Sequence, residues 1–450
     1  MRDEGQSGSG SSIRAAPASL RPRFTGAAWF LVVVAAFAVV GALFDAYPAW
    51  LTGIAGWMAC ALLWPRLSSG QARVVLALLV VGSAGILWGM ASGVTGLMAR
   101  ALAQNIPLIG MLIAVSFLRL ISTAPGANDE PPSTGRLALL KTLVGVHLFG
   151  SVINFSAVAI FADRLAGRAR LTLEQAIGLS QAFMSAALWS PFFGAMAVTL
   201  TVAPEASLAR LMGVGMPLAA LGIVLTWLTL SSKRYAYARE FDGYPIHFKA
   251  LWVPAVLAAG VLIVHEYERE WSVLAIITVL APLLTVITLL VREGARTGAS
   301  LLRLVRLRLP EMSGEVSLFL AAGVLSAGMA GVIAALDLGV PFERFGGLEA
   351  SLVFLGISAF ALMGFHPVIL ISVVGTWLMP LDPDQTLLAI TFLMTWGIGL
   401  PACPMANTLV AVHGRYGVPF GELLRRNRRF SFTMTIPALA VLNVYAYFAV

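Results

Sequence analysis

The sequence consists mainly of long apolar runs that short polar segments separate. A helix that crosses a bilayer needs about 20 consecutive apolar residues, so each such run predicts one transmembrane helix. The pattern predicts 11 of these helices and therefore an all-α polytopic membrane protein. They cover about residues 27–47, 49–64, 73–94, 106–121, 172–200, 207–230, 250–266, 272–291, 315–337, 386–412 and 430–449.

Two further apolar segments, 137–163 and 349–380, do not fit this pattern. Each is long for one crossing and short for two, since two crossings and a turn need roughly 40 residues at 1.5 Å rise per residue. These lengths suit re-entrant hairpins, which enter and leave the membrane on the same side.

The distribution of arginine and lysine supports the hairpins, because cytosolic loops of membrane proteins carry an excess of both. With two hairpins, 26 of the 30 basic residues fall on one side of the membrane. If either segment crossed the membrane alone, the loops after it would change sides and this bias would be lost. We therefore expect a multi-pass protein of a bacterial inner membrane, with a cytosolic N-terminus and an external C-terminus.

Two parts of the chain, about 210 residues apart, match each other. Glu174-Gln175 is followed, 16 positions after the Gln, by Pro191, and Asp384-Gln385 is followed at the same spacing by Pro401. Proline removes a backbone donor and breaks a helix. At membrane depth a broken helix is tolerated only where protein packs around it or where it lines a cavity. Matched breaks in two halves indicate a secondary transporter built from inverted repeats.

The predicted organisation is a disordered cytosolic tail, a leading transmembrane helix and two inverted repeats joined by a cytosolic linker. The tail covers 1–25 and the leading helix covers 26–48. The repeats cover 49–231 and 250–450, and the linker between them covers 232–249. An amphipathic stretch at 300–309 predicts a further helix along the membrane surface.

Composition supports the membrane class, since 59% of the residues are hydrophobic and 12% are charged. The formal net charge of +8 is explained by the cytosolic loops, so we expect no nucleic-acid partner. The sequence shows no Walker motif, zinc pattern or nucleophile elbow. We therefore expect no enzyme, no metal and no cofactor, apart from coupling Na⁺ or H⁺.

The hairpin tips are the first candidate binding site. The first tip falls near Gly150–Asn154 and the second near Gly364–Pro367. Converging helix N-termini attract an anion. His366 is the only ionisable residue between Glu349 and Asp382, and it can bind an anion or relay a proton. The alternative is a neutral histidine that is bonded to a carbonyl. The candidates from the tips are Ser151, Asn154, Gly364, His366 and Pro367.

The broken helices are the second candidate site. A break leaves main-chain carbonyls without helical partners, and these can coordinate Na⁺. It also creates a half-helix N-terminus, which can bind a carboxylate. The candidates here are Ser190, Pro191, Pro401, Asn407 and Thr408, with Na⁺ expected near Asn154, Asn407 and Thr408. The alternative is a packing kink at each proline.

Several other polar residues are expected to have structural roles. Glu174 and Asp384 lie at helix starts, where a carboxylate complements the helix dipole. His147 is expected to be structural, and Gln175, Gln181 and Gln385 to cap or cross-link helices.

This layout resembles the ion transporter superfamily, and within it the divalent anion:sodium symporters and arsenite-type permeases. Hairpin tips in that family generally carry Ser-Asn-Thr. The corresponding triplets here are Ile153-Asn154-Phe155 and Phe365-His366-Pro367, so Asn154 carries over and His366 takes the equivalent place. The resemblance implies an elevator, in which hairpins and broken helices move as a transport domain against a scaffold, and a homodimer.

The sequence thus favours a secondary active transporter of a small anionic solute, either a carboxylate or an oxyanion. Two alternatives are a polytopic membrane enzyme that acts on a lipid-linked glycan and a passive ion channel. An enzyme of that kind needs a sizeable basic external loop, whereas the predicted external loops are short.

Overall fold

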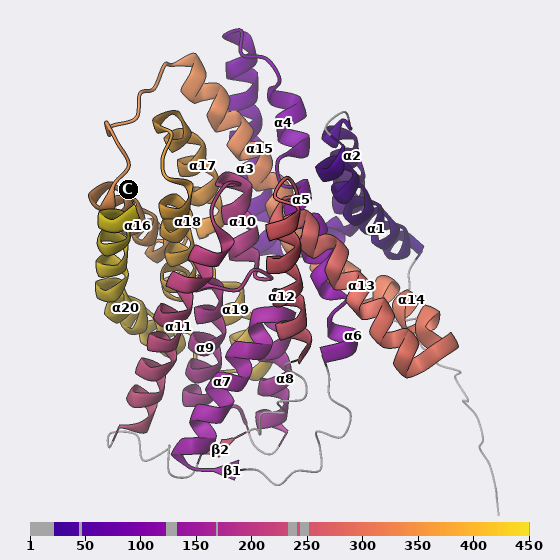
Figure 1. The fold of residues 1–450 in the computed structure, drawn as a ribbon, viewed down its shortest axis with the longest axis vertical. Helices are drawn as coiled ribbons and strands as arrows, with labels where there is room; N and C mark the ends of the chain where they lie inside the picture. The colour runs from indigo at the N-terminus through magenta and orange to yellow at the C-terminus, as the bar shows by residue number, and fades with distance from the viewer. Residues whose placement is uncertain are drawn as a thin grey trace, which may run out of the picture.

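The computed structural model describes residues 22–44, 47–122, 133–167, 170–232, 241–243 and 252–449. These residues are almost entirely helical (Figure 1). One antiparallel pair joins the two-residue strands β1 (Ser133–Thr134) and β2 (Asp242–Gly243), with Ser133 opposite Gly243. Among the described residues, eight helical stretches are long and apolar enough to cross a membrane. The prediction of an all-α, multi-pass membrane protein is therefore confirmed, whereas the number of crossings stays a prediction.

Most of the predicted tail lies outside the described residues, and the first helix begins at Pro22 rather than at 26. The predicted linker 232–249 also lies largely outside them. The short run at 49–64 forms a helix of only 15 residues.

One group of helices combines the leading helix with the first part of each predicted repeat. The tightest packing within it is between α3 (Ser69–Ala91) and α15 (Ser313–Ala335). A Cβ on Gly82 would lie 2.7 Å from Leu325 Cα, and one on Gly85 would lie 2.7 Å from the Gly328 oxygen. Glycines thus bring the two backbones into contact, as small residues do between membrane helices. The other members are α1 (Pro22–Leu43), α2 (Ala49–Leu63), α4 (Leu97–Ala103), α5 (Ile106–Ser116), α6 (Arg119–Ser122), α12 (Trp252–Tyr267), α13 (Val273–Glu293) and α14 (Thr297–Leu307).

A second group contains both hairpin segments, both broken helices and the last helix of each predicted repeat. In Figure 1 it occupies mainly the left of the molecule. Its members are α7 (Arg136–Ile153), α8 (Phe155–Ala166), α9 (Leu173–Ser185), α10 (Gly194–Val202), α11 (Leu208–Ser231), α16 (Gly347–Leu362), α17 (Pro367–Leu378), α18 (Gln385–Met394), α19 (Asn407–Tyr416) and α20 (Phe420–Ala449).

Both hairpin segments fold back on themselves near the predicted tips. Helices α7 and α8 are joined at Asn154 alone, which has a φ of 52°, and the Phe149 and Phe161 rings meet across the turn at 6.1 Å. Helices α16 and α17 are joined by residues 363–366, where Gly364 has a φ of 107°. A residue without a side chain adopts this left-handed conformation at no steric cost.

Both predicted breaks are present. Helix α9 ends at Ser185 and, after one 3₁₀ turn, α10 begins at Gly194, so Pro191 lies in the non-helical segment. Helix α18 ends at Met394, and a π turn and a 3₁₀ turn that contains Pro401 precede α19. The breaks touch, since a Cβ on Gly397 would lie 2.6 Å from Leu188 Cγ.

The starts of the two broken helices are capped. Asp384 accepts a hydrogen bond from the Leu387 N–H at 2.6 Å, which confirms it as a cap. The expectation that Glu174 caps the first broken helix is wrong: the cap is Thr172, which forms a reciprocal capping box with Gln175, and Glu174 lies in the first turn.

The packing of the two halves is reciprocal. Helix α10, the second part of one broken helix, packs on α17 of the other hairpin, and α19 packs on α8. In the first group, α15 packs on α3 and α13 packs on α5. This exchange of partners is what a pseudo-two-fold axis between inverted repeats would produce.

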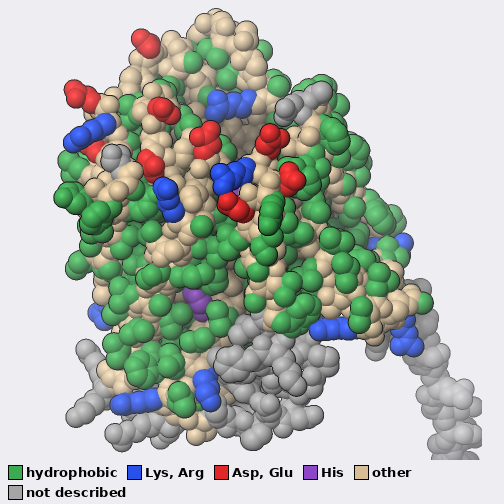
Figure 2. All heavy atoms as spheres, in the orientation of Figure 1, with side chains coloured by type: hydrophobic (Ala, Val, Ile, Leu, Met, Phe, Trp, Pro, Cys, Tyr) green, Lys and Arg blue, Asp and Glu red, His purple; other side chains and the backbone are tan. Residues whose placement is uncertain are grey.

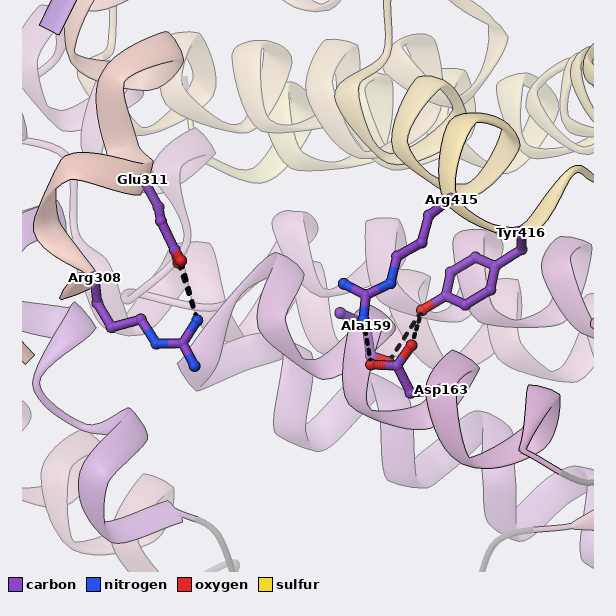
Figure 3. Close-up of polar contacts among 6 residues, drawn as sticks. All are labelled: Ala159, Asp163, Arg308, Glu311, Arg415 and Tyr416. Atoms are coloured by element: carbon purple, nitrogen blue, oxygen red, sulfur yellow. Dashed lines mark hydrogen bonds and ion pairs between the residues drawn. The ribbon is translucent and has the colours of Figure 1, made fainter. Parts of the chain in front are cut away.

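Charged side chains differ between the two ends of the molecule. On the face drawn in Figure 2, the acidic side chains gather over the upper part, whereas the charged side chains in the lower part are Lys and Arg. The predicted surface helix is α14, which buries Leu304 and Val305 and exposes Arg303 and Arg306. Arg308, just after it, pairs with Glu311 at 3.1 Å (Figure 3).

Candidate solute-binding site

A cavity of about 410 Å³ lies between α3 and α15 on one side and the tip of the second hairpin on the other. The second broken helix contributes Met405 and Asn407 to its wall. Helices α3 and α15 supply Gln71, Val74, Val75, Ala77, Leu78, Val81, Gly314, Leu318 and Leu325, and the hairpin supplies Gly364, Phe365, His366 and Ile369. The cavity therefore lies at the junction of the two groups of helices, and ligand pockets of this volume are common in proteins.

The wall of this cavity is mostly apolar, with polar side chains at Gln71, His366 and Asn407. None of its lining residues is Lys, Arg, Asp or Glu. Two helices begin at the cavity, α17 just after His366 and α19 at Asn407. Because a helix N-terminus carries a partial positive charge, these two ends supply electrostatic attraction for an anion without a charged side chain.

His366 is held in one orientation. Its Nδ1 accepts the Val368 N–H at 3.2 Å, so this nitrogen carries no proton and Nε2 is the remaining N–H donor. The ring lies edge-on to Trp396 of the π turn, with centroids 5.3 Å apart. His366 therefore caps α17 and joins the hairpin tip to the second break.

Arg428 of α20 makes a second connection between this hairpin and this break. Its Nε donates to the Ala402 oxygen at 3.2 Å, and its Nη2 donates to the Leu362 oxygen at 2.9 Å. Arg428 falls between the predicted helices 386–412 and 430–449, in a predicted cytosolic loop, but it lies inside α20, which begins at Phe420. The buried positions Leu423, Asn427, Phe430 and Met434 follow a helical period and are the signal that could have located this helix.

The first hairpin and the first break are connected by different groups. The Ser190 hydroxyl donates to the Ser151 oxygen, and the Asn154 amide donates to the Phe192 oxygen at 3.2 Å. Neutral side chains therefore bind the carbonyls at this tip and break. None of Ser151, Asn154, Ser190 and Pro191 lines the 410 Å³ cavity.

The structure thus separates the predicted site residues into two sets. Gly364, His366 and Asn407 line the cavity. Pro367 and Thr408 are the residues next to His366 and Asn407 in the chain, and Pro401 lies in the 3₁₀ turn before α19. The other four belong to the first hairpin and break. Sequence reasoning missed the opposite wall from α3 and α15, because a row of apolar residues with one glutamine looks the same whether it faces lipid or a cavity.

His147, predicted to be structural, is buried and bonded at both ring nitrogens. Nδ1 lies 2.9 Å from the Ala182 oxygen, and Nε2 accepts the Trp189 indole N–H at 3.0 Å. Since Nε2 must accept, the proton lies on Nδ1. Gln181 accepts a hydrogen bond from Thr226 at 2.9 Å, so it cross-links α9 to α11 as expected.

Replacing His147 with leucine should lower the free energy of unfolding by about 1–3 kcal/mol, because the indole N–H of Trp189 loses its acceptor inside the protein. Denaturant titration of the detergent-solubilised protein measures this change. In a Trp189→Phe background the same substitution should cost much less, since the donor is absent. Equal costs in both backgrounds would contradict this role of the histidine.

A polar contact joins the first hairpin to the second broken helix. Arg415 Nη2 lies 2.7 Å from Asp163 Oδ2, and the Tyr416 hydroxyl donates to Asp163 Oδ1 at 2.6 Å (Figure 3). Asp163 lies in α8 and its partners in α19, so the contact spans the two halves of the chain. It fixes α19 against the exit arm of the first hairpin.

Comparisons with known proteins leave the family open. No family model matches the sequence, and no curated protein matches it. Among solved structures, the chain is similar to the YdaH transporter of Alcanivorax borkumensis, with a TM-score of 0.46 and 16% identity over 83% of this chain and 86% of that one. A likeness at this level assigns neither a family nor a function, so the function is argued from the site.

Proposed function

We propose that this protein is a secondary active transporter of a small anionic solute, a carboxylate or an oxyanion. The solute binds in the cavity at the tip of the second hairpin. Access then alternates as the hairpins and broken helices move against the group that contains α3 and α15. Two predicted inverted repeats, with re-entrant hairpins that open to opposite sides, form the framework of this mechanism.

One observation carries the proposal: the 410 Å³ cavity lies between the two groups of helices rather than within either of them. Its two walls belong to different bodies, so relative movement of these bodies would change which end of the cavity is open. The long, glycine-lined contact between α3 and α15 favours that pair as the fixed wall. The tip of the second hairpin meets this wall across the cavity, whereas farther along the hairpin α17 packs on α15, with a Ser326–Thr376 hydrogen bond at 3.1 Å.

An anion is favoured by the helix ends at the cavity, and its size is limited by the cavity volume. The N-termini of α17 and α19 offer partial positive charge at His366 and Asn407. The surrounding wall is apolar, so desolvation strengthens these interactions. The proposal includes coupling of transport to Na⁺ or to H⁺. Melting with and without Na⁺, and at two pH values, distinguishes these two coupling ions.

The cavity extends to the N-terminal ends of α3 and α15, where Gln71 and Gly314 line it. Arg66, Arg73 and Arg308 lie close to these two ends in the sequence. By the positive-inside rule this end is cytosolic. In this proposal the cavity faces the cytosol, and the protein belongs to a bacterial inner membrane.

Ligand-dependent melting tests the proposal. Cys60 and Cys403 are buried, so a thiol-reactive dye reports unfolding of the purified protein. Acetate, succinate, hexanoate, phosphate and sulfate, each with and without Na⁺ and at two pH values, are compared with neutral amides of the same carboxylates. A ligand at about 100 times its dissociation constant should stabilise the protein by roughly 2.7 kcal/mol.

Uptake of a stabilising anion into proteoliposomes then separates the alternatives. Saturable accumulation driven by a Na⁺ or H⁺ gradient supports a transporter, whereas a unitary current indicates a channel. Stabilisation by the neutral amides and not by the anions would contradict the proposed charge preference. Hydrolysis or transfer of a lipid-linked glycan without accumulation of any anion would favour the enzyme.

A further inference from the structure

The side chain of Arg428 binds two main-chain oxygens at the second break. Leu362 is the last residue of α16, and Ala402 is the last residue of the 3₁₀ turn before α19. Carbonyls at helix C-termini lack intrahelical partners and carry partial negative charge. The Arg428 guanidinium donates to both of these carbonyls, at 2.9 and 3.2 Å.

The neighbours of Arg428 place it in this position. Asn427 is fully buried, donates to the Leu423 oxygen within α20 and lies 3.4 Å from the Ser180 hydroxyl of α9. The next buried residue, Phe430, packs toward Gly222 of α11. The side of α20 that carries Asn427 is thus fixed against the bundle, and the guanidinium of the following residue reaches the break.

Arg425 of the same helix behaves differently. Arg425 is exposed and forms an ion pair with Glu422 of its own helix at 2.6 Å. Arg428 instead donates to two main-chain oxygens that come from segments 40 residues apart in sequence. An exposed ion pair contributes little to stability, whereas a charge-assisted bond to an otherwise unpaired carbonyl is among the stronger hydrogen bonds.

The first break provides a comparison within the same chain. There the Phe192 oxygen accepts from the neutral Asn154 amide. Released carbonyls and half-helix C-terminal ends are the groups that coordinate Na⁺ in transporters with discontinuous helices. Among the described contacts, the carbonyls at the second break thus accept from a positive charge, whereas the Phe192 oxygen at the first break accepts from a neutral amide.

We propose that the Arg428 guanidinium takes the place of a sodium ion at the second break, so that Na⁺ does not bind there unless the side chain is removed. The positive charge of the guanidinium is covalently part of the protein, whereas a bound Na⁺ would exchange with ions in solution. Combined with the proposed transport function, on which this consequence rests, any Na⁺ coupling must come from the first half. The solute site at His366 and Asn407 then keeps its neighbouring cation in every step of the cycle.

The test compares Na⁺-dependent melting of wild type with that of Arg428→Ala, and it needs no solute. Each protein is melted in NaCl and in choline chloride of equal ionic strength, over a series of concentrations. Any response of the wild type to Na⁺ comes from the first half alone, so Arg428→Ala should respond more strongly to Na⁺ than the wild type does. Arg428→Ala should melt lower than wild type in choline and should regain stability saturably in Na⁺. Arg425→Ala, which removes an arginine of the same helix, should behave as the wild type does in both salts.

Identical responses of wild type and Arg428→Ala to Na⁺ would overturn the proposal, whether both respond or neither does. If Arg428→Ala cannot be purified, Arg428→Gln carries the same comparison, because its amide can still donate to one carbonyl but has no charge. This experiment measures cation binding and not transport. Absence of transport in proteoliposomes would therefore reject the proposed function, while the role of Arg428 at the second break would still be decided by the melting comparison.

Discussion

Replacing Gly215 with alanine should lower the free energy of unfolding by about 3 kcal/mol, near the upper end of what overpacking costs. A Cβ at this position of α11 would lie 2.0 Å from the Leu188 oxygen and 3.0 Å from Trp189 Cβ. Both atoms belong to the segment where the first helix breaks, so relief requires movement of backbone rather than of a side chain. Denaturant titration of the detergent-solubilised protein measures the loss.

Gly213 of the same helix is the matched control. A Cβ at Gly213 would meet nothing within 4 Å, so Gly213→Ala should leave stability unchanged or raise it by up to about 1 kcal/mol through helix propensity. The Gly215 substitution should also expose Cys60 and Cys403 to a thiol-reactive dye at a lower temperature. Equal effects of the two substitutions would show that α11 does not contact the break as closely as described.

Filling the cavity should abolish solute binding without unfolding the protein. Ala77 lies in the wall that α3 contributes, and a tryptophan at this position would extend into the cavity between α3 and the hairpin tip. We expect Ala77→Trp to eliminate the melting shift given by the anion identified in the ligand comparison, and to reduce its uptake to the level of empty liposomes. Because the wall of the cavity is apolar, it can accommodate the indole ring, so the melting temperature of Ala77→Trp without ligand should stay close to that of wild type.

Leu76 provides the control for this substitution. It is adjacent in the helix, 54% exposed and absent from the cavity wall, and helical geometry turns it about 100° away from Ala77. Leu76→Trp should therefore retain both the ligand shift and uptake. Retention of both by Ala77→Trp as well would mean that the solute does not enter this cavity, and the proposed site would be rejected.

The sequence was sufficient to locate the features that backbone chemistry enforces locally. Pro191 and Pro401 cannot continue a helix, so the two breaks could be read from their positions. Asp384 could be recognised as a cap because a carboxylate at a helix start accepts an N–H bond. The folding back at Asn154 and Gly364 followed from segment length, since an apolar run of intermediate length cannot cross a membrane twice.

Contacts between distant segments could not be read in the same way. Arg428 was assigned to a loop because a charge counted by sequence position looks cytosolic, yet a 30-residue helix carries it to the second break. Likewise, Asn154 was expected to share a chamber with His366, whereas the cavity is lined by His366 and not by Asn154. Side chains from the first tip instead bind carbonyls of their own break.

The sequence by itself determined that this protein is an all-helical, multi-pass membrane protein with two broken helices and two chain reversals. Those features depend on the length of each apolar run and on proline and glycine positions, all of which can be read within one segment of the chain. Only the tertiary structure decided which groups face each other: α3 and α15 across from His366, and Arg428 against Leu362 and Ala402. The physical reason is that an apolar side chain has the same sequence signature toward lipid, core or cavity, so the facing helix determines its role.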